Sequence, residues 1–143
     1  IKWFLTRNRR LDITMSLDPD RREVSYRLGR LFAALEKTQE DALGRSLNRT
    51  IRESFYSSGS ATPRMVFPRL LRVHQHHLAK LEPGLRVARD KLVQQIIGDL
   101  GEFPAHLGLD DQGLFAIGYY HQRQNFFTPR SNRTDEEIRE ATT

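Results

Sequence analysis

The chain contains no cysteine among its 143 residues. Disulfide bonds, cysteine-ligated zinc sites and thiol nucleophiles are therefore excluded. No uninterrupted apolar stretch reaches the roughly 18 residues that a membrane helix needs, and the opening IKWFL is too short for a signal peptide. These absences predict a protein with no membrane partner and favour a cytoplasmic location. We expect one domain whose core needs neither a disulfide nor a metal.

Motifs for catalysis and metal binding are also missing. The sequence has no phosphate-binding glycine loop, nucleophile elbow or HExxH motif. His74 and His77 have the i, i+3 spacing of a ligand pair, but no carboxylate stands at a matching helical position. His74 projects among apolar residues, so we interpret it as a core or interface histidine. We therefore predict a protein that is not an enzyme and uses no metal, cofactor or small-molecule substrate.

Lysine is scarce and arginine abundant. Only four of the 23 basic residues are lysines, and the formal net charge is +5 at pH 7. Arginine binds phosphate through a planar bidentate fork, so the bias favours phosphate contacts, although a GC-rich genome produces the same bias. The interval 54–81 contains Arg64, Arg69, Arg72 and Lys80 but no carboxylate. It predicts a face that meets a polyanion, with an ordinary solvated helix face as the alternative.

The hydrophobic pattern predicts an all-α bundle of about five helices. Capping residues, prolines and glycines place these helices at 18–43, 49–57, 63–81, 85–100 and 109–127. Residues 1–17 are expected to form an extended lead-in and 128–143 a polar tail, so that the bundle domain spans 18–127. One buried face is expected on the first helix, formed by Val24, Leu28, Leu31, Phe32 and Leu35. A similar face is expected on the fourth, formed by Leu85, Ala88, Leu92, Ile96 and Leu100.

Turn and cap residues set the predicted boundaries. Asp18, followed by proline, is expected to begin the first helix, and Gly44 to end it. Asn48 is the expected cap of the second helix, which the SSGS segment 57–60 should break. The segment 82–84 is expected to turn the chain before the fourth helix.

Basic residues gather on the faces of these helices. On the helix after Thr62, an aligned row is expected from Arg69, Arg72, His76 and Lys80. Further candidates for contact with nucleic-acid phosphates are Arg64, Arg27, Arg30, Lys37, Arg45, Arg49 and Arg52. Arg89 projects among apolar residues and must either pair with an internal carboxylate or face a partner. That alternative stays open, and Arg89 and Arg123 are our candidate protein-interface residues.

The segment GYYHQRQNFF, 118–127, crowds aromatic and imidazole rings around a single helix. A helix that is apolar nearly all round is usually central in its bundle. Core packing is therefore the first interpretation of this segment. Stacking on nucleic-acid bases is the second.

Four motifs occur in the order found in one known family: YRLGRLFA at 26–33, NRTIRESFY at 48–56, SATPRMVFPRLL at 60–71 and DQGLFAIGYYHQRQNFF at 111–127. In this combination, residues 17–127 resemble the C-terminal helical region of the large subunit of the type I-C CRISPR surveillance complex (Cascade). The same region is also produced alone as the small subunit of that complex. The resemblance implies a helical bundle that lies along the interior of an RNA-guided complex. Its implied partners are the backbone subunits, the large subunit, another copy of itself, and the target or non-target DNA strand.

We therefore expect a non-catalytic subunit that stabilises unwound target DNA, the R-loop, through basic surface residues. Because the sequence begins at Ile1 and lacks the parts with which the large subunit reads the motif flanking the target, we favour the free small subunit. A domain excised from the large subunit is the alternative. The rival function is a pure scaffold whose arginines contact only neighbouring proteins. A stand-alone DNA-binding regulator ranks last because no helix-turn-helix signal is recognisable.

Overall fold

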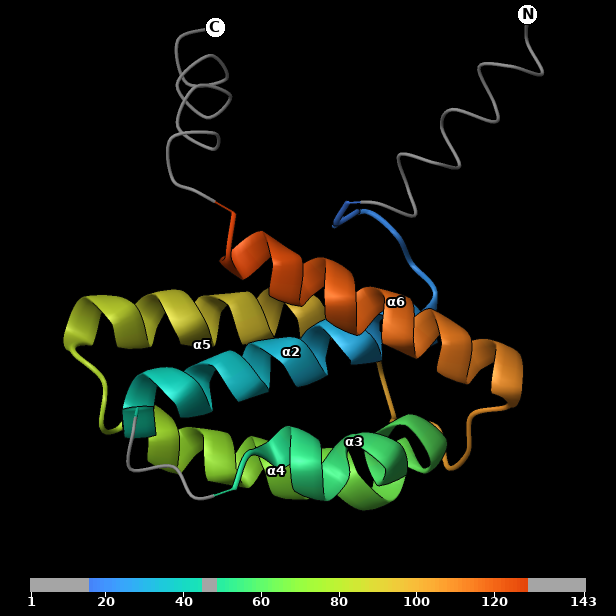
Figure 1. Ribbon diagram of the computed structural model, residues 1–143, viewed down its shortest axis with the longest axis horizontal. Coiled ribbons are helices and arrows are strands. Elements are labelled where there is room, and N and C mark those ends of the chain that lie inside the picture. The colour runs from blue at the N-terminus through green and yellow to red at the C-terminus, as the bar shows by residue number, and fades with distance from the viewer. Residues whose placement is uncertain (1–15, 45–48, 129–143) are drawn as a thin grey trace, which may run out of the picture.

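A computed structural model describes residues 16–44 and 49–128 (Figure 1). These residues form five α-helices and no strand: α2 (Val24–Leu43), α3 (Ile51–Ala61), α4 (Pro63–Leu78), α5 (Pro83–Ile97) and α6 (Leu109–Phe126). The predicted all-α bundle is confirmed. Nearly all of the predicted lead-in and tail lies outside the described residues. In the described part of the chain, no helix is long and apolar enough to cross a membrane.

Helix α2 occupies the centre of the bundle. It contacts each of the other described helices, and Figure 1 shows it between α5 and α6 on one side and α3 and α4 on the other. Every residue from Ser25 to Glu36 except Arg27 is buried. The single buried face predicted for this helix is therefore too narrow, because neighbours enclose α2 all round. Val24, at its first residue, is the exception within the predicted face and is 37% exposed.

The start of α2 differs from the prediction. Asp18 begins a turn, because its carboxylate accepts a hydrogen bond from the N–H of Asp20 and its carbonyl oxygen accepts one from Arg21. Helix α2 begins only at Val24, after Glu23. Its end agrees with the prediction, since Gly44 follows the last helical residue with a φ of 53°, a conformation that favours glycine.

Helix α3 is capped and ended by other residues than predicted. Thr50 caps it, because the Thr50 hydroxyl accepts a hydrogen bond from the N–H of Glu53. The helix continues through the SSGS segment to Ala61. Gly59 and Ser60 are both buried there, so tertiary packing outweighs their weak helix propensity.

Helix α5 is shifted towards its N-terminus relative to the prediction. Pro83 lies in its first turn, where the missing N–H of proline costs nothing, and Gly98 ends it. Its buried residues are Val93 and Ile96. Leu85, at 37% exposure, and the exposed Ala88 do not join the core, so the predicted apolar face is correct only for the second half of the helix.

Aromatic rings fill the space between α2 and the helices that cover it. The Phe32 ring makes edge contacts, with centroid separations from 5.6 to 6.4 Å, with Tyr56, Phe67, Phe115 and Tyr119. Two rings of the GYYHQRQNFF segment, by contrast, are exposed: Tyr120 by 52% and Phe127 by 58%. The segment is therefore divided between core packing and surface.

Helices α2 and α6 approach most closely at a pair of glycines. A Cβ added to Gly29 would overlap the carbonyl oxygen of Phe115, and one added to Gly118 would overlap the carbonyl oxygen of Tyr26. Each glycine thus lies directly against the backbone of the other helix. The close approach brings polar side chains into contact, including Tyr26 and His121, which share a hydrogen bond of 2.9 Å.

His74 lies in the core beneath α4, as predicted. It is 1% exposed, and neither ring nitrogen has a hydrogen-bond partner among the described residues. The nearest charge is the Asp90 carboxylate of α5, 3.9 Å from Nε2. Burial lowers the pKa of His74, while Asp90 opposes this shift. Burial also lowers the pKa of His77, with Lys80 and His76 adding repulsion.

These lowered pKa values predict a loss of stability in mild acid. Both histidines bind protons more readily in the unfolded chain, so the free energy of unfolding is highest above their ordinary pKa of about 6.5. It should fall as the pH drops below that value, by at most about 1.4 kcal/mol per pH unit for each histidine. Urea unfolding between about pH 7.5 and pH 5.5 measures this slope.

Replacing His74 with leucine should reduce this pH dependence, because the ring makes no hydrogen bond that leucine would lose. His76→Leu, an exposed position on the same helix, is the matched control and should leave the slope unchanged. Equal slopes in the wild type and His74→Leu would contradict the prediction.

Candidate nucleic-acid interface

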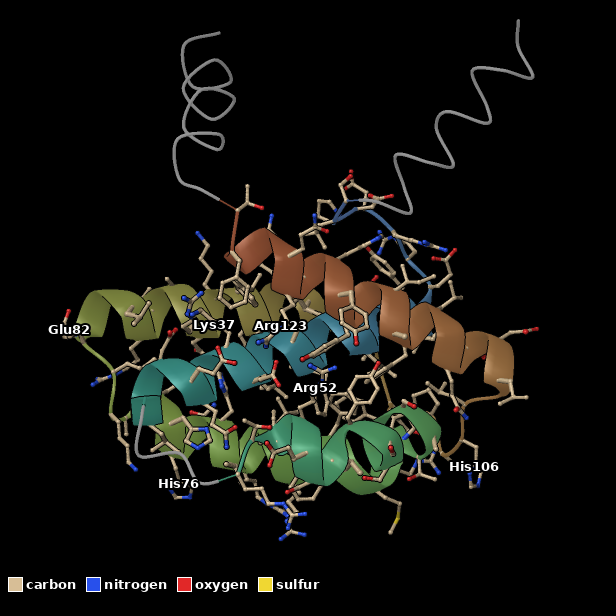
Figure 2. All side chains as sticks on the ribbon, in the orientation of Figure 1. Lys37, Arg52, His76, Glu82, His106 and Arg123 are labelled. Carbon is tan, nitrogen blue, oxygen red and sulfur yellow. The ribbon has the colours of Figure 1, made fainter. Side chains whose placement is uncertain are left out.

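Helix α4 carries basic side chains on the face turned away from the bundle. We call this the α4 basic face, and it consists of Arg64, Arg69, Arg72, His76 and Lys80, all exposed. At 100° per residue, Arg69, Arg72 and His76 lie opposite the buried Phe67, Leu70 and His74. In Figure 2 the His76 side chain lies at the lower edge of the bundle and points away from α2.

No ion pair engages the α4 basic face within the described residues. Arg69 is positioned by an aromatic ring, with its guanidinium 5.3 Å from the centre of the Phe55 ring. Arg64 donates a 3.2 Å hydrogen bond to the carbonyl oxygen of Phe103. Both contacts are neutral, so the positive charge of this face remains available to an anion.

Other predicted phosphate contacts are engaged inside the bundle. Arg27 donates hydrogen bonds to the carbonyl oxygens of Ile96 and Ile97 at the end of α5 and pairs with Asp99. Lys37 pairs with Asp41 at 3.1 Å. We therefore correct the predicted flank of α2: these two cations hold helices together and are not free for phosphate.

Arg30 does not lie on an exposed flank either. It is 7% exposed, and its Nε donates a 3.1 Å hydrogen bond to the side-chain oxygen of Gln122 on α6. Burial lowers the pKa of Arg30, and the charge of Arg27 lowers it further against an opposing effect of Tyr26. The prediction of a surface contact at this position is corrected, because α2 is enclosed where the sequence pattern indicated a border.

Arg89 resolves the alternative that the sequence left open. Its Nε donates to the Asp41 carboxylate at 2.7 Å, so it forms an internal salt bridge between α5 and α2. The guanidinium also lies over the Phe126 ring. Asp41 thus receives both Lys37 and Arg89, and the predicted interface role of Arg89 is replaced by a structural one.

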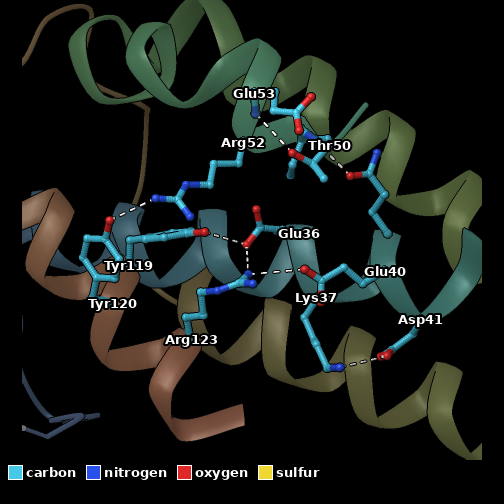
Figure 3. Close-up of polar contacts among 12 residues, drawn as sticks. Glu36, Lys37, Glu40, Asp41, Thr50, Arg52, Glu53, Tyr119, Tyr120 and Arg123 are labelled. Carbon is cyan, nitrogen blue, oxygen red and sulfur yellow. Dashed lines mark hydrogen bonds and ion pairs between the residues drawn. The ribbon is translucent and has the colours of Figure 1, made fainter. Parts of the chain in front are cut away.

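Arg123 likewise belongs to an internal network, shown in Figure 3. It pairs with Glu36 and Glu40 of α2, and the Tyr119 hydroxyl donates a 2.6 Å hydrogen bond to Glu36. Burial raises the pKa of Tyr119, and the hydrogen bond to Glu36 raises it further. Burial alone would lower the pKa of Arg123, but Glu36, Tyr119 and Glu40 raise it above its ordinary value.

The remaining candidates lie near α3. Arg52 is exposed, donates a hydrogen bond of 3.0 Å to the Tyr120 hydroxyl and lies over the Tyr119 ring. Arg49 is exposed and has no ion pair among the described residues. Arg45 lies outside the described residues. In the ranges 16–44 and 49–128, no three histidine or carboxylate side chains are grouped as a metal site would require.

Sequence reasoning missed Arg21 and Arg22. The structure brings both beside Arg27 and Arg30, where the four side chains line one pocket. The adjacent arginines before α2 were a visible signal. Their grouping with α2 depends on the end of α5, which no local pattern places.

Comparison with curated proteins gave no match. The family described as CRISPR-associated protein (Cas_Csd1) matches residues 1–127 and thus includes every described helix. This match confirms the resemblance carried by the motifs of α2, α3, α4 and α6. The chain therefore belongs to the CRISPR-associated protein family Cas_Csd1 and is a component of a CRISPR Cascade complex.

Proposed function

We propose that this chain is the small subunit of a type I-C CRISPR surveillance complex and that it stabilises unwound DNA through the α4 basic face. The supporting observation is that Arg69, Arg72 and Lys80 are exposed and make no ion pair among the described residues. Arginine on a solvent-facing helix can bind phosphate through its bidentate fork. The role requires no base-specific contact, because guide pairing reads the sequence.

The spacing along α4 suits a phosphate backbone. With a rise of about 1.5 Å per residue, Arg69 and His76 are separated by about 10 Å along the helix axis. One strand of B-form DNA places about three phosphates in that length. Several contacts to one strand can therefore form at once, without any change in the helix.

Association with other subunits of the complex follows from family membership, and the exposed apolar residues offer surface for it. Val87 on α5 is 65% exposed and Leu85 is 37% exposed. These residues lie on a different helix from the α4 basic face. We propose that α5 packs against backbone subunits, the large subunit or another copy, while α4 meets DNA.

Replacing Arg69, Arg72 and Lys80 together with alanine should weaken DNA binding by the assembled complex. Each lost phosphate contact releases fewer counterions, so the slope of log affinity against log salt should become shallower by about 0.7 to 0.9 per contact. Affinity for target DNA, measured at several salt concentrations in the assembled particle, gives both quantities.

The matched control is Arg22→Ala with Lys91→Ala, two exposed charges outside the α4 basic face. Per charge removed, it should change the slope less than the triple replacement does. Size-exclusion chromatography of the triple variant separates the rival function: loss of assembly indicates a scaffold, whereas intact assembly with weakened DNA binding supports our proposal. An unchanged salt slope in an intact particle would reject it.

A further inference from the structure

A pocket of about 390 Å³ lies where the segment before α2 meets the end of α5. Four arginines line it, Arg21, Arg22, Arg27 and Arg30, together with the carboxylates of Asp20 and Asp99. This volume is at the lower end of the range for small-molecule sites. In Figure 1, the segment before α2 and the end of α5 lie across α2 from α4, so the pocket is separate from the α4 basic face.

Three of the four guanidinium groups already have carboxylate partners. Arg21 pairs with Glu23. Arg22 and Arg27 share Asp99, at 3.1 Å and 3.2 Å. Arg27 is further fixed by the carbonyl oxygens at the end of α5. These three side chains therefore form neutralised, positioned walls.

Arg30 is different, because no carboxylate neutralises it. Among the described residues its only hydrogen bond runs from Nε to the uncharged Gln122, so its terminal nitrogens have no protein partner. The side chain is 7% exposed and lines the pocket. A buried guanidinium without a counter-charge is costly, and an anion that entered the pocket would remove that cost. Burial and the neighbouring Arg27 lower the pKa of Arg30, which reports the same missing charge.

We propose that this pocket binds a phosphate group, with Arg30 as its charged ligand and Arg27 beside it. Phosphate carries more acceptor oxygens than a carboxylate and can receive hydrogen bonds from several guanidinium groups together. Asp20 and Asp99 also line the pocket, so a second phosphate would be repelled and the site suits one phosphate. A backbone phosphodiester and a free nucleotide both supply this chemistry, and the experiment distinguishes them.

Thermal unfolding of the full chain tests the proposal. Three probes are titrated at constant ionic strength: inorganic phosphate, thymidine monophosphate and a short oligothymidylate, with acetate as the carboxylate control. At about ten times its Kd, a bound probe should raise the Tm by roughly 5 °C. A larger shift with the oligonucleotide than with the monophosphate identifies a nucleic-acid backbone, and equal shifts identify a free nucleotide.

Arg30→Met should abolish the phosphate-dependent shift. Arg30→Lys retains the charge without the fork and should keep a smaller shift, which provides a second test should Arg30→Met not fold. Lys91→Met, an exposed cation on α5, is the control for net charge and should behave as the wild type. The readout is the ligand-dependent shift, because Arg30→Met also leaves the Gln122 oxygen without its donor.

Three results would overturn the proposal: no shift with any phosphate probe, a full shift retained by Arg30→Met, or acetate acting as well as phosphate. The last would indicate a carboxylate of a protein partner. The alanine triple variant of the α4 basic face separates this proposal from the proposed function. It should lose affinity for DNA in the complex yet keep its Tm shift with inorganic phosphate.

Discussion

Gly118→Ala is expected to lower the free energy of unfolding by about 3 kcal/mol or more, the largest effect of any single methyl group in the bundle. The added Cβ would overlap the carbonyl oxygen of Tyr26 and come within 3.2 Å of its Cα. Backbone atoms of a buried helix cannot rotate away as a side chain can. Helix α6 must therefore move off α2, and the ring contacts and hydrogen bonds between the two helices weaken with it.

Gly113→Ala on the same helix is the matched control. A Cβ there meets nothing within 4 Å, so alanine should be neutral or stabilise by up to about 1 kcal/mol through its higher helix propensity. Chemical unfolding of both variants measures the difference. Similar stabilities for Gly118→Ala and Gly113→Ala would show that the two helices are not in close contact in solution.

Arg123→Met is expected to destabilise the protein by about 2 to 3 kcal/mol, somewhat less than for a fully buried ion pair because Arg123 is partly exposed. Its removal leaves the Glu36 carboxylate, whose side chain is 2% exposed, with only the Tyr119 hydroxyl as a hydrogen-bond donor. The cost arises from the buried charge that remains and not from the contact itself.

The double variant Arg123→Met with Glu36→Gln isolates that cost. Glutamine removes the charge and still accepts the Tyr119 hydrogen bond, so the double variant should be more stable than Arg123→Met alone. A double-mutant cycle measured by urea unfolding gives the coupling energy, which we expect to exceed about 1 kcal/mol. Additive effects of the two substitutions would contradict the network of Figure 3.

The helical class of the fold could be predicted from the sequence because caps, prolines and hydrophobic spacing are local signals. Pro63 opens α4 and Gly44 ends α2 as expected. The α4 basic face was also visible, because a stretch without carboxylates cannot form an internal ion pair within its own helix. Asp18 misled the prediction, since its side chain stabilises a turn as readily as it caps a helix.

The fate of individual cations could not be read from the sequence. Lys37 and Arg89 meet at Asp41, and Arg123 meets Glu36, only after helices distant along the chain have packed. A helical projection indicates which side of a helix is polar, but not whether another helix covers that side. Arg30 illustrates this, since its partner Gln122 belongs to the last described helix.

The glycine contact between α2 and α6 has a consequence for synthesis of the protein. Gly29 leaves the ribosome early, whereas the backbone that must lie against it, around Phe115 and Tyr119, is made some 90 residues later. Until then the nascent first helix has no cover for Tyr26 or Glu36, so the centre of this domain is assembled after translation of its last helix.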